Sequence, residues 1–266
     1  MFAYRATSGP VEVAFTDRAG GVSGPPFDSL NLAASSGDVA GAVTTNLCRV
    51  QQAFSAPAVG RPTDSTDPGD ALPLALMHQV HGADVVRVRP GEVPASPRPG
   101  LDHLPIADGL VTDEAGLALV VRVADCVPLL LADPEAGVAA ALHVGRPGLV
   151  AGVVATGMAA MAGIGADPAR VLAWIGPHVC GRCYEVPASM RDEVEAAVPG
   201  SAAETSWGTP AVDLAAGVLA QLSAAGVGSL RVQAVGRCTR EDLGLYSYRR
   251  DGRTSGRLAG LVRLAP

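Results

Sequence analysis

The sequence predicts an α/β protein in which mixed β-sheets stack on one another and helices flank them, as one domain over residues 1–266. Near-continuous apolar runs crowd the middle of the chain, and such runs are typical of strands buried on both faces. Segments of helical periodicity occur before and after them, but strands and helices do not alternate regularly, which disfavours a doubly wound sheet. The composition, 48% hydrophobic and 17% charged, indicates a folded chain with a large core.

The N-terminal part predicts one strand and one helix. Residues 11–17 alternate well enough for a strand, and Gly20-Gly21 then marks a turn. Apolar residues recur at helical spacing over residues 40–54. Residues 56–73 and 94–104 are rich in Pro, Gly, Asp and Ser, so we expect an exposed insertion and a surface loop there.

The rest of the chain predicts most of the sheet structure. Apolar runs predict strands at 74–80, 84–89, 117–123, 128–132, 138–144, 171–175 and 230–235. Helices are expected at 149–162, 187–197 and 212–224, the first tolerating its glycines because they pack closely.

Charge and cysteine content narrow the expected partners and compartment. The net charge is −6 and every basic residue is an arginine, so a surface that binds nucleic acid is not expected. The most apolar stretch, residues 117–132, contains Arg122, Asp125 and Pro128 and is too short to span a bilayer. The N-terminus lacks the pattern of a signal peptide. With five cysteines, an odd number, the chain is expected in a reducing compartment, by default the cytoplasm.

Four residues of two types that bind zinc, histidine and cysteine, lie in or beside the apolar runs. His78 and His81 are close together in MHQVHG, Cys126 follows Ala124-Asp125, and His143 ends another run. One thiolate and two imidazoles suit a three-ligand zinc site whose fourth position is open to water or substrate. The alternative interpretation is purely structural. Cys126 would be a small buried residue, and each histidine a hydrogen-bonded core residue. A nucleophile and base pair, Cys126 and His143, is a further alternative.

Other segments carry weaker indications of chemistry. Cys180 and Cys183 form a CxxC that could be half a zinc site or a redox pair, but a turn with one buried thiol is favoured. Arg18, beside the Gly20-Gly21 turn, could bind an anion through its guanidinium and neighbouring backbone N–H groups. The arginines at 249 and 250 are equally compatible with a solvated strand edge.

Short motifs along nearly the whole chain together resemble the laccase-domain family, also called the YfiH or YlmD family. They are TDRAGGVS at 16–23, FDSLNL at 27–32, QVHG at 79–82, ADGL at 107–110, ADCVP at 124–128, HVG at 143–145, GP at 176–177, CYEV at 183–186 and YSYRRDG at 246–252. The set is specific because the pieces occur in family order.

The resemblance implies an α/β/β/α arrangement of layers and a site for one zinc per chain, with copper as a further possibility. It implies that the metal ligands are His81, Cys126 and His143, and it selects His81 over His78. Where the family has Trp followed by a basic residue after HxG, this chain has Arg146-Pro147. Arg146 is therefore the expected substitute for that basic residue.

The activity implied by the resemblance is on purine nucleosides: phosphorolysis of adenosine, inosine or methylthioadenosine, and deamination of adenosine. Zinc-activated water suits attack on C6 of adenine. The predicted catalytic residues are Cys126, Asp125 and Arg18, with Asp125 protonating the base. Arg18, Ser23, Asn31 and Arg146 are the predicted substrate-binding residues. The expected partners are a small nucleoside and phosphate, with neither nucleic acid nor membrane.

Two alternative functions use the same residues. A cysteine-type amide hydrolase acting on peptidoglycan precursors would use Cys126 as nucleophile and need no zinc. A copper-dependent phenol oxidase of the laccase type would need roughly ten histidine ligands for four coppers. The chain has five histidines, which argues against such a cluster.

Overall fold

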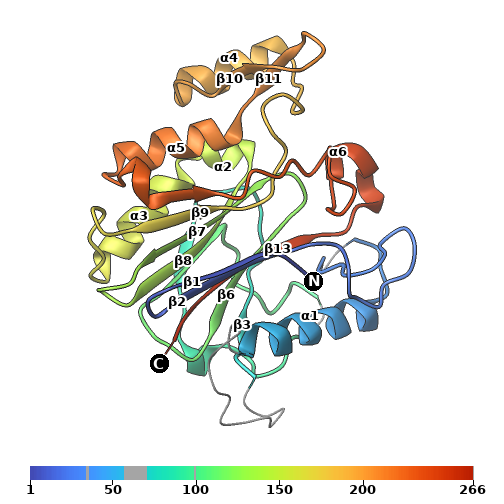
Figure 1. Ribbon diagram of the computed structural model, residues 1–266, viewed down its shortest axis with the longest axis vertical. Coiled ribbons are helices and arrows are strands. Elements are labelled where there is room, and N and C mark those ends of the chain that lie inside the picture. Colours follow the sequence, from blue (N-terminus) through green and yellow to red (C-terminus); the bar gives the residue numbers. More distant parts are fainter. Residues whose placement is uncertain (34–35, 57–70, 99, 266) are drawn as a thin grey trace.

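Two stacked β-sheets form the centre of the molecule, with helices on both outer faces (Figure 1). The computed structural model describes residues 1–33, 36–56, 71–98 and 100–265. The layer order is one helix, a five-stranded sheet, a six-stranded sheet and a group of helices. This confirms the predicted stacked, helix-flanked sheets. Most of the predicted insertion at 56–73 lies outside the described residues.

The five-stranded sheet joins the two ends of the chain. Its order is β1 (Phe2–Ser8), β2 (Val11–Thr16), β13 (Leu258–Leu264), β6 (Ala118–Val123) and β3 (Leu74–Ala75). Strand β13 is antiparallel to both β2 and β6. Helix α1 (Ala40–Ser55) covers the outer face, where Leu47, Val50 and Phe54 pack with Val120 of β6.

The six-stranded sheet lies between the other sheet and the remaining helices. Its order is β12 (Val232–Ala234), β9 (Leu172–Ile175), β7 (Val127–Asp133), β8 (Val138–Val144), β5 (Gly109–Thr112) and β4 (Val85–Arg87). The outer face packs against α2 (Arg146–Ala151), α3 (Val153–Gly163), α4 (Ala188–Ala197) and α5 (Leu214–Ala224).

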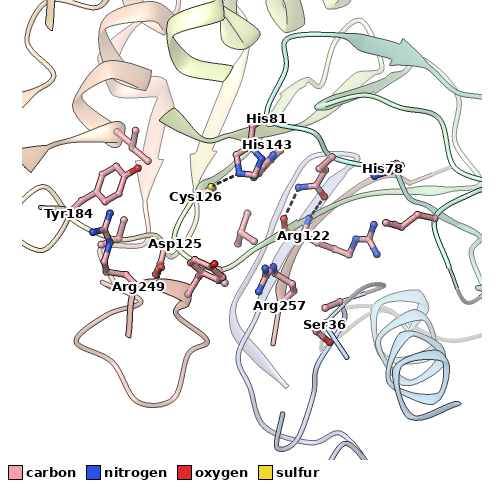
Figure 2. Close-up of a pocket in the computed structure, with 18 residues that line it drawn as sticks. Ser36, His78, His81, Arg122, Asp125, Cys126, His143, Tyr184, Arg249 and Arg257 are labelled. Carbon is pink, nitrogen blue, oxygen red and sulfur yellow. Dashed lines mark hydrogen bonds between the residues drawn. The ribbon is translucent and has the colours of Figure 1, made fainter. Parts of the chain in front are cut away.

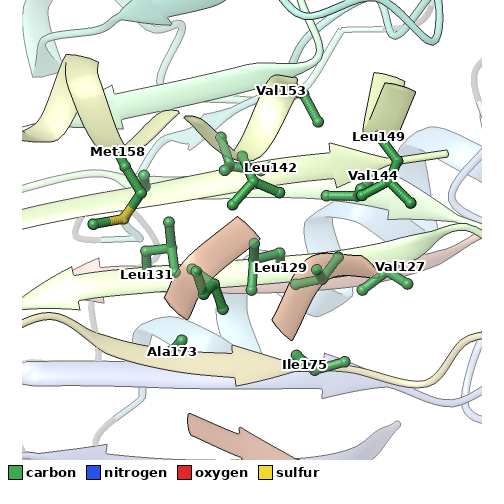
Figure 3. Close-up of a cluster of buried hydrophobic side chains, with 14 of the residues drawn as sticks. Val127, Leu129, Leu131, Leu142, Val144, Leu149, Val153, Met158, Ala173 and Ile175 are labelled. Atoms are coloured by element: carbon green, nitrogen blue, oxygen red, sulfur yellow. The ribbon is translucent and has the colours of Figure 1, made fainter. Parts of the chain in front are cut away.

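Side-chain alternation explains why the strands are apolar throughout. Along β7, Val127, Leu129 and Leu131 point to the helices (Figure 3), whereas Leu130 packs between the two sheets. Successive side chains of a strand face opposite sides, so a strand covered on both sides has no polar face. The central sheet strands are therefore fully buried.

Several elements differ from the sequence-based expectation. The predicted helix 149–162 is two helices, α2 and α3, separated at Gly152, which has φ +83°. The predicted strand 74–80 ends at Ala75. Strands β1, β5 and β13 were not predicted, nor was the hairpin of β10 (Ala202–Glu204) and β11 (Pro210–Val212). The arginines at 249 and 250 lie in helix α6 (Tyr248–Asp251), so the strand-edge interpretation is wrong.

The short elements complete the described chain. Three 3-10 helices are η2 (Pro90–Glu92), η3 (Ser229–Arg231) and η4 (Gly252–Thr254). The described segments contain no helix that is both long enough and apolar enough to traverse a bilayer.

Candidate metal centre

The six-stranded sheet brings His81, Cys126 and His143 to one edge. Strands β7 and β8 are antiparallel, so Cys126, just before β7, lies beside His143 near the end of β8. Strand β5 is antiparallel to β8 and parallel to β4, so the segment before β4, which contains His81, reaches the same edge. The three candidate donor atoms all lie within 4.8 Å of one another (Figure 2). His78 is not in this group.

The donor group is open on one side. Cys126 Sγ lies 3.7 Å from His81 Nε2, and the two imidazole rings are 4.7 Å apart between centroids. His143 is buried, Cys126 is partly buried and His81 is exposed. His81 has φ +62°, a conformation that non-glycine residues rarely adopt and that is common at functional sites. Such a set suits a metal with a free coordination position.

Asp108 is the residue that orients both histidines. Its carboxylate is fully buried and lies 2.7 Å from His143 Nδ1, so that nitrogen donates to it and Nε2 is left for a metal. It also accepts the backbone N–H groups of His81 and Gly82. Burial would raise the Asp108 pKa, but the hydrogen bonds from His143 and from the Gly82 backbone lower it and keep the carboxylate ionised. Its position directly before β5, in one of the family-like motifs, was the available sequence signal.

Cys126 and His143 stabilise each other's charged forms. Burial would raise the Cys126 pKa, but the two imidazoles outweigh it and lower the pKa to about 6. Burial would likewise lower the pKa of His143, but Cys126 and Asp108 raise it to about 9. Without a metal, the site therefore holds a thiolate beside an imidazolium near neutral pH.

This pairing predicts the alkylation behaviour of Cys126 in chelator-treated protein. Only the thiolate reacts, so the rate should stay high at neutral pH and fall as the pH drops through about 6. A free model thiol, with a pKa of about 8.5, should lose its reactivity well above that range. Iodoacetamide labelling followed by peptide mass analysis measures Cys126 separately. A half-maximal rate near the model thiol's pH would contradict the predicted pairing.

Gly145 provides the space that the donor group needs. A Cβ at this position would lie 2.6 Å from His81 Cδ2 and 3.1 Å from Cys126 Sγ. Atoms this close must move apart, and the exposed His81 ring is the one free to move. The glycine of the HVG motif is therefore required because a side chain at this position would collide with His81 and Cys126. Its backbone dihedral angles do not require a glycine.

Gly145→Ala should consequently weaken metal binding without unfolding the protein. We expect at least a roughly 10-fold loss of zinc affinity, comparable to losing an orienting partner. Gly41→Ala is the matched control, because a Cβ there meets no atom within 4 Å. Chelator competition measures the affinity and thermal denaturation checks the fold. Unchanged affinity in Gly145→Ala would show that the site accommodates the methyl group.

A cavity of about 590 Å³ adjoins the donor group. It is lined by Ala33, Ser36, His78, Gln79, His81, Leu101, Arg122, Val123, Ala124, Asp125, Cys126, His143, Val179, Tyr184, Leu214, Tyr248, Arg249 and Arg257. In Figure 2, Tyr184 and Arg249 lie on one side of the candidate ligands, and Arg122 and Arg257 on the other. The volume is in the range of small-molecule sites.

Arg122 and Arg257 make one end of the cavity positive. Arg122 is 8% exposed and donates to the Met77 carbonyl, and Arg257 donates to backbone carbonyls of its own loop. Burial, together with the charge of Arg257, lowers the Arg122 pKa to about 10. Neither guanidinium forms a salt bridge with the described part of the chain. A buried and a partly buried cation without a salt bridge to the described residues favour an anionic ligand. Neither arginine was predicted from the sequence to bind a ligand.

Asp125 lines the cavity but is already hydrogen-bonded at both oxygens. Oδ1 accepts the Thr239 hydroxyl and Oδ2 accepts the Arg249 backbone N–H. Its φ is +90°. In this arrangement the carboxylate connects the Cys126 loop to the C-terminal segment. Its predicted role in protonating the base stays a prediction.

The four predicted substrate-binding residues do not line this cavity. Arg18 pairs with Asp28, its Nη2 lying 3.5 Å from the carboxylate. Ser23 and Asn31 are buried, and both accept hydrogen bonds from the side-chain amide of Asn46 in α1. Arg146 begins helix α2. Their roles towards phosphate and nucleoside stay predictions, but the arginines that the structure brings to the site are others.

The fold and the site together define a stacked-sheet α/β protein with a His₂Cys donor group beside a cationic cavity. The chain belongs to the laccase-domain (YfiH-like) family, because the family described as multi-copper polyphenol oxidoreductase laccase matches residues 12–265. This places it in a family of enzymes.

Relatives and solved structures agree with that assignment. A protein of Streptomyces coelicolor named purine nucleoside phosphorylase SCO2081 is 52% identical over 264 residues, covering 99% of this chain and 100% of that protein. The purine nucleoside phosphorylase Rv2149c of Mycobacterium tuberculosis is 47% identical, covering 93% and 89%. The crystal structure of YlmD from Geobacillus stearothermophilus has a TM-score of 0.83 at 29% identity, covering 97% of this chain and 93% of that one.

Proposed function

We propose that this protein is a zinc-dependent purine nucleoside phosphorylase acting on adenosine, inosine and methylthioadenosine, with adenosine deaminase activity. The observation that carries the proposal is the His81, Cys126 and His143 donor group beside a cavity that Arg122 and Arg257 also line. The names of the relatives, each a purine nucleoside phosphorylase, support the reaction class.

The donor chemistry fits zinc. His81, Cys126 and His143 offer two imidazole nitrogens and one thiolate, and Asp108 holds His143 in the tautomer that presents Nε2. When bound, zinc would supply a Lewis acid and a water of lowered pKa. Three protein donors would leave one coordination position for water or substrate, and all three residues line the cavity. Copper could bind to the same three donors. These donors hold a single ion, which is too few for a multicopper cluster.

The cavity offers separate regions for the parts of the substrates. Arg122 and Arg257 would bind phosphate through charge-assisted hydrogen bonds. Tyr184, with the Arg249 guanidinium 4.9 Å from its ring centroid, offers an aromatic surface to the purine. A purine held between Tyr184 and the metal ligands would direct its ribose towards the arginines.

Each reaction needs a different nucleophile in this arrangement. In phosphorolysis, a phosphate oxygen bonds to C1′ of the ribose, the C1′–N9 bond breaks, and the purine leaves with a proton supplied from solvent or the site. In deamination, a water oxygen bonds to C6 and ammonia leaves. Arg122 and Arg257 serve the first reaction, because only it consumes phosphate.

Product chromatography with adenosine, inosine or methylthioadenosine tests the proposal. Phosphate-dependent release of the free base and ribose 1-phosphate is expected. Adenosine should also be converted to inosine, and this reaction should not require phosphate. Both should disappear on chelation and return with zinc. If neither product forms from any of the three nucleosides in zinc-loaded protein, the proposal is wrong.

One observation favours the cysteine hydrolase as the second candidate. Asp108, His143 and Cys126 form an acid–base–thiolate series like that of cysteine proteases, and the Cys126 pKa is lowered to about 6. An amide hydrolase acting on peptidoglycan precursors would need no zinc. Amide hydrolysis that survives chelation and stops on alkylation of Cys126 would support it over the phosphorylase.

A further inference from the structure

A second group of metal-binding side chains lies apart from the three candidate ligands. Cys180, Cys183, Cys238 and Glu241 place their Sγ and carboxylate oxygen atoms within 4.8 Å of one another. We call these four residues the CCCE cluster. The CxxC alone indicated a turn with one buried thiol, and the Cys183 N–H does donate to the Cys180 carbonyl. The third cysteine and the glutamate come from a distant part of the sequence.

The sheet brings the two halves of the cluster together. Strands β9 and β12 are adjacent and parallel, so the loops that follow them leave the same edge. The pairing continues beyond the strands: His178 and Cys238 form a parallel bridge, and the Thr239 N–H donates to the His178 carbonyl. This places the CxxC loop after β9 against the CxxE segment after β12.

The local contacts hold the cluster before any ion binds. The Cys180 N–H lies 3.4 Å from Cys238 Sγ, a contact typical of thiolate-rich metal sites. Cys183 is 4% exposed, Cys180 and Cys238 are partly buried, and Glu241 is exposed. The cluster is therefore reachable from solvent at its carboxylate, while its thiols are shielded. All three thiols are free in the structure.

We propose that the CCCE cluster binds a structural zinc ion. Four donors complete a tetrahedron and leave no position for substrate, which distinguishes this site from the three-donor centre. Thiolates dominate the set, and thiolate-rich tetrahedral sites select zinc among the common divalent ions. Binding would release the thiol protons to solvent, because the ligands are thiolates.

The position of the cluster indicates what this ion does. Tyr184 directly follows Cys183 and lines the cavity. Thr239 directly follows Cys238, and its hydroxyl donates to Asp125 at 2.6 Å. A zinc ion would thus clamp the loop that carries Tyr184 to the segment whose Thr239 supports Asp125 in the cavity wall. The CCCE residues touch no reacting atom, so their role is positioning.

Metal analysis of the full-length protein tests the proposal. Wild-type protein should bind two zinc ions per chain, and Cys126→Ala should keep one. Cobalt substituted into Cys126→Ala should give the strong thiolate charge-transfer absorption of a three-cysteine site. Glu241→Gln should weaken that remaining ion by at least roughly 10-fold in chelator competition. The exposed Glu193 provides the matched control, Glu193→Gln, which should change nothing.

Two results would overturn the proposal independently of the nucleoside activity. One is a wild-type protein that binds a single zinc, lost completely in Cys126→Ala. The other is a metal-free protein lighter by two hydrogen atoms, with a disulfide mapped among Cys180, Cys183 and Cys238. Glu241 is exposed, so Glu241→Gln is not expected to disturb folding. Equal zinc affinities in Glu241→Gln and Glu193→Gln would be a third result that contradicts the proposal.

Discussion

Replacing Cys126 with alanine is expected to lower both nucleoside activities by roughly 100-fold or more. Loss of a metal ligand should cost more than loss of an orienting partner, which typically costs 10- to 100-fold. The zinc content should fall by about one equivalent, the zinc of the CCCE cluster remaining. Steady-state kinetics with adenosine, with and without phosphate, and elemental analysis measure the two effects.

The combination of the two measurements separates the candidate functions. Activity and metal lost together support the metal-dependent phosphorylase. Activity lost with metal content unchanged would mean that Cys126 acts as a nucleophile, as in the cysteine hydrolase. Cys48→Ala is the control, since Cys48 lies in α1, on the outer face of the other sheet, and should behave as the wild type.

Arg257→Gln is expected to raise the phosphate KM of phosphorolysis by roughly 10- to 100-fold. A charge-assisted hydrogen bond contributes about 1.5–3 kcal/mol, and about 1.4 kcal/mol corresponds to a factor of ten. Deamination should change little, because it uses no phosphate. Arg257 is preferred to Arg122 for this test, because Arg122 is nearly fully buried and supports the Met77 backbone. Initial rates over a phosphate titration give the KM.

Arg18→Ala is the informative comparison for that experiment. Arg18 is the phosphate ligand predicted from its glycine turn, but its guanidinium is engaged by Asp28. If the phosphate KM rises in Arg18→Ala and not in Arg257→Gln, the sequence-based prediction is right and the Arg122–Arg257 assignment is wrong. Equal losses of both activities in Arg257→Gln would instead mean that Arg257 binds the nucleoside or supports the fold.

The fold was predictable where strands are strongly apolar. Strands β6, β7, β8 and β9 and helix α1 lie close to their predicted ranges, since burial on both faces demands continuous apolar sequence. Strand β13 was not predicted: it contains Gly260, whose missing side chain makes room for Phe15. Such a glycine weakens a strand pattern locally and is explained only by its neighbour in the sheet.

Local sequence could propose His81, Cys126 and His143 because their residue types suit zinc, and the family-like motifs selected His81 over His78. It assigned no role to Asp108, although that residue lies in the ADGL motif, because Asp108 acts through hydrogen bonds to segments that precede β4 and end β8. It also placed the anion site at Arg18. The contacts of Asp108 depend on long-range sheet pairing, which a local motif does not report, and the anion site at Arg18 stays a prediction.

The sequence by itself determined the donor chemistry, the buried strands and the family. Only the tertiary structure decided which side chains meet. Sheet order puts the segments before β4, β5 and β7 beside the end of β8, and so assembles one metal centre. The parallel pairing of β9 with β12 joins Cys180 and Cys183 to Cys238 and Glu241. The physical reason is that strand identity depends on local hydrophobicity, whereas the neighbours of a strand end depend on pairing across the whole sheet.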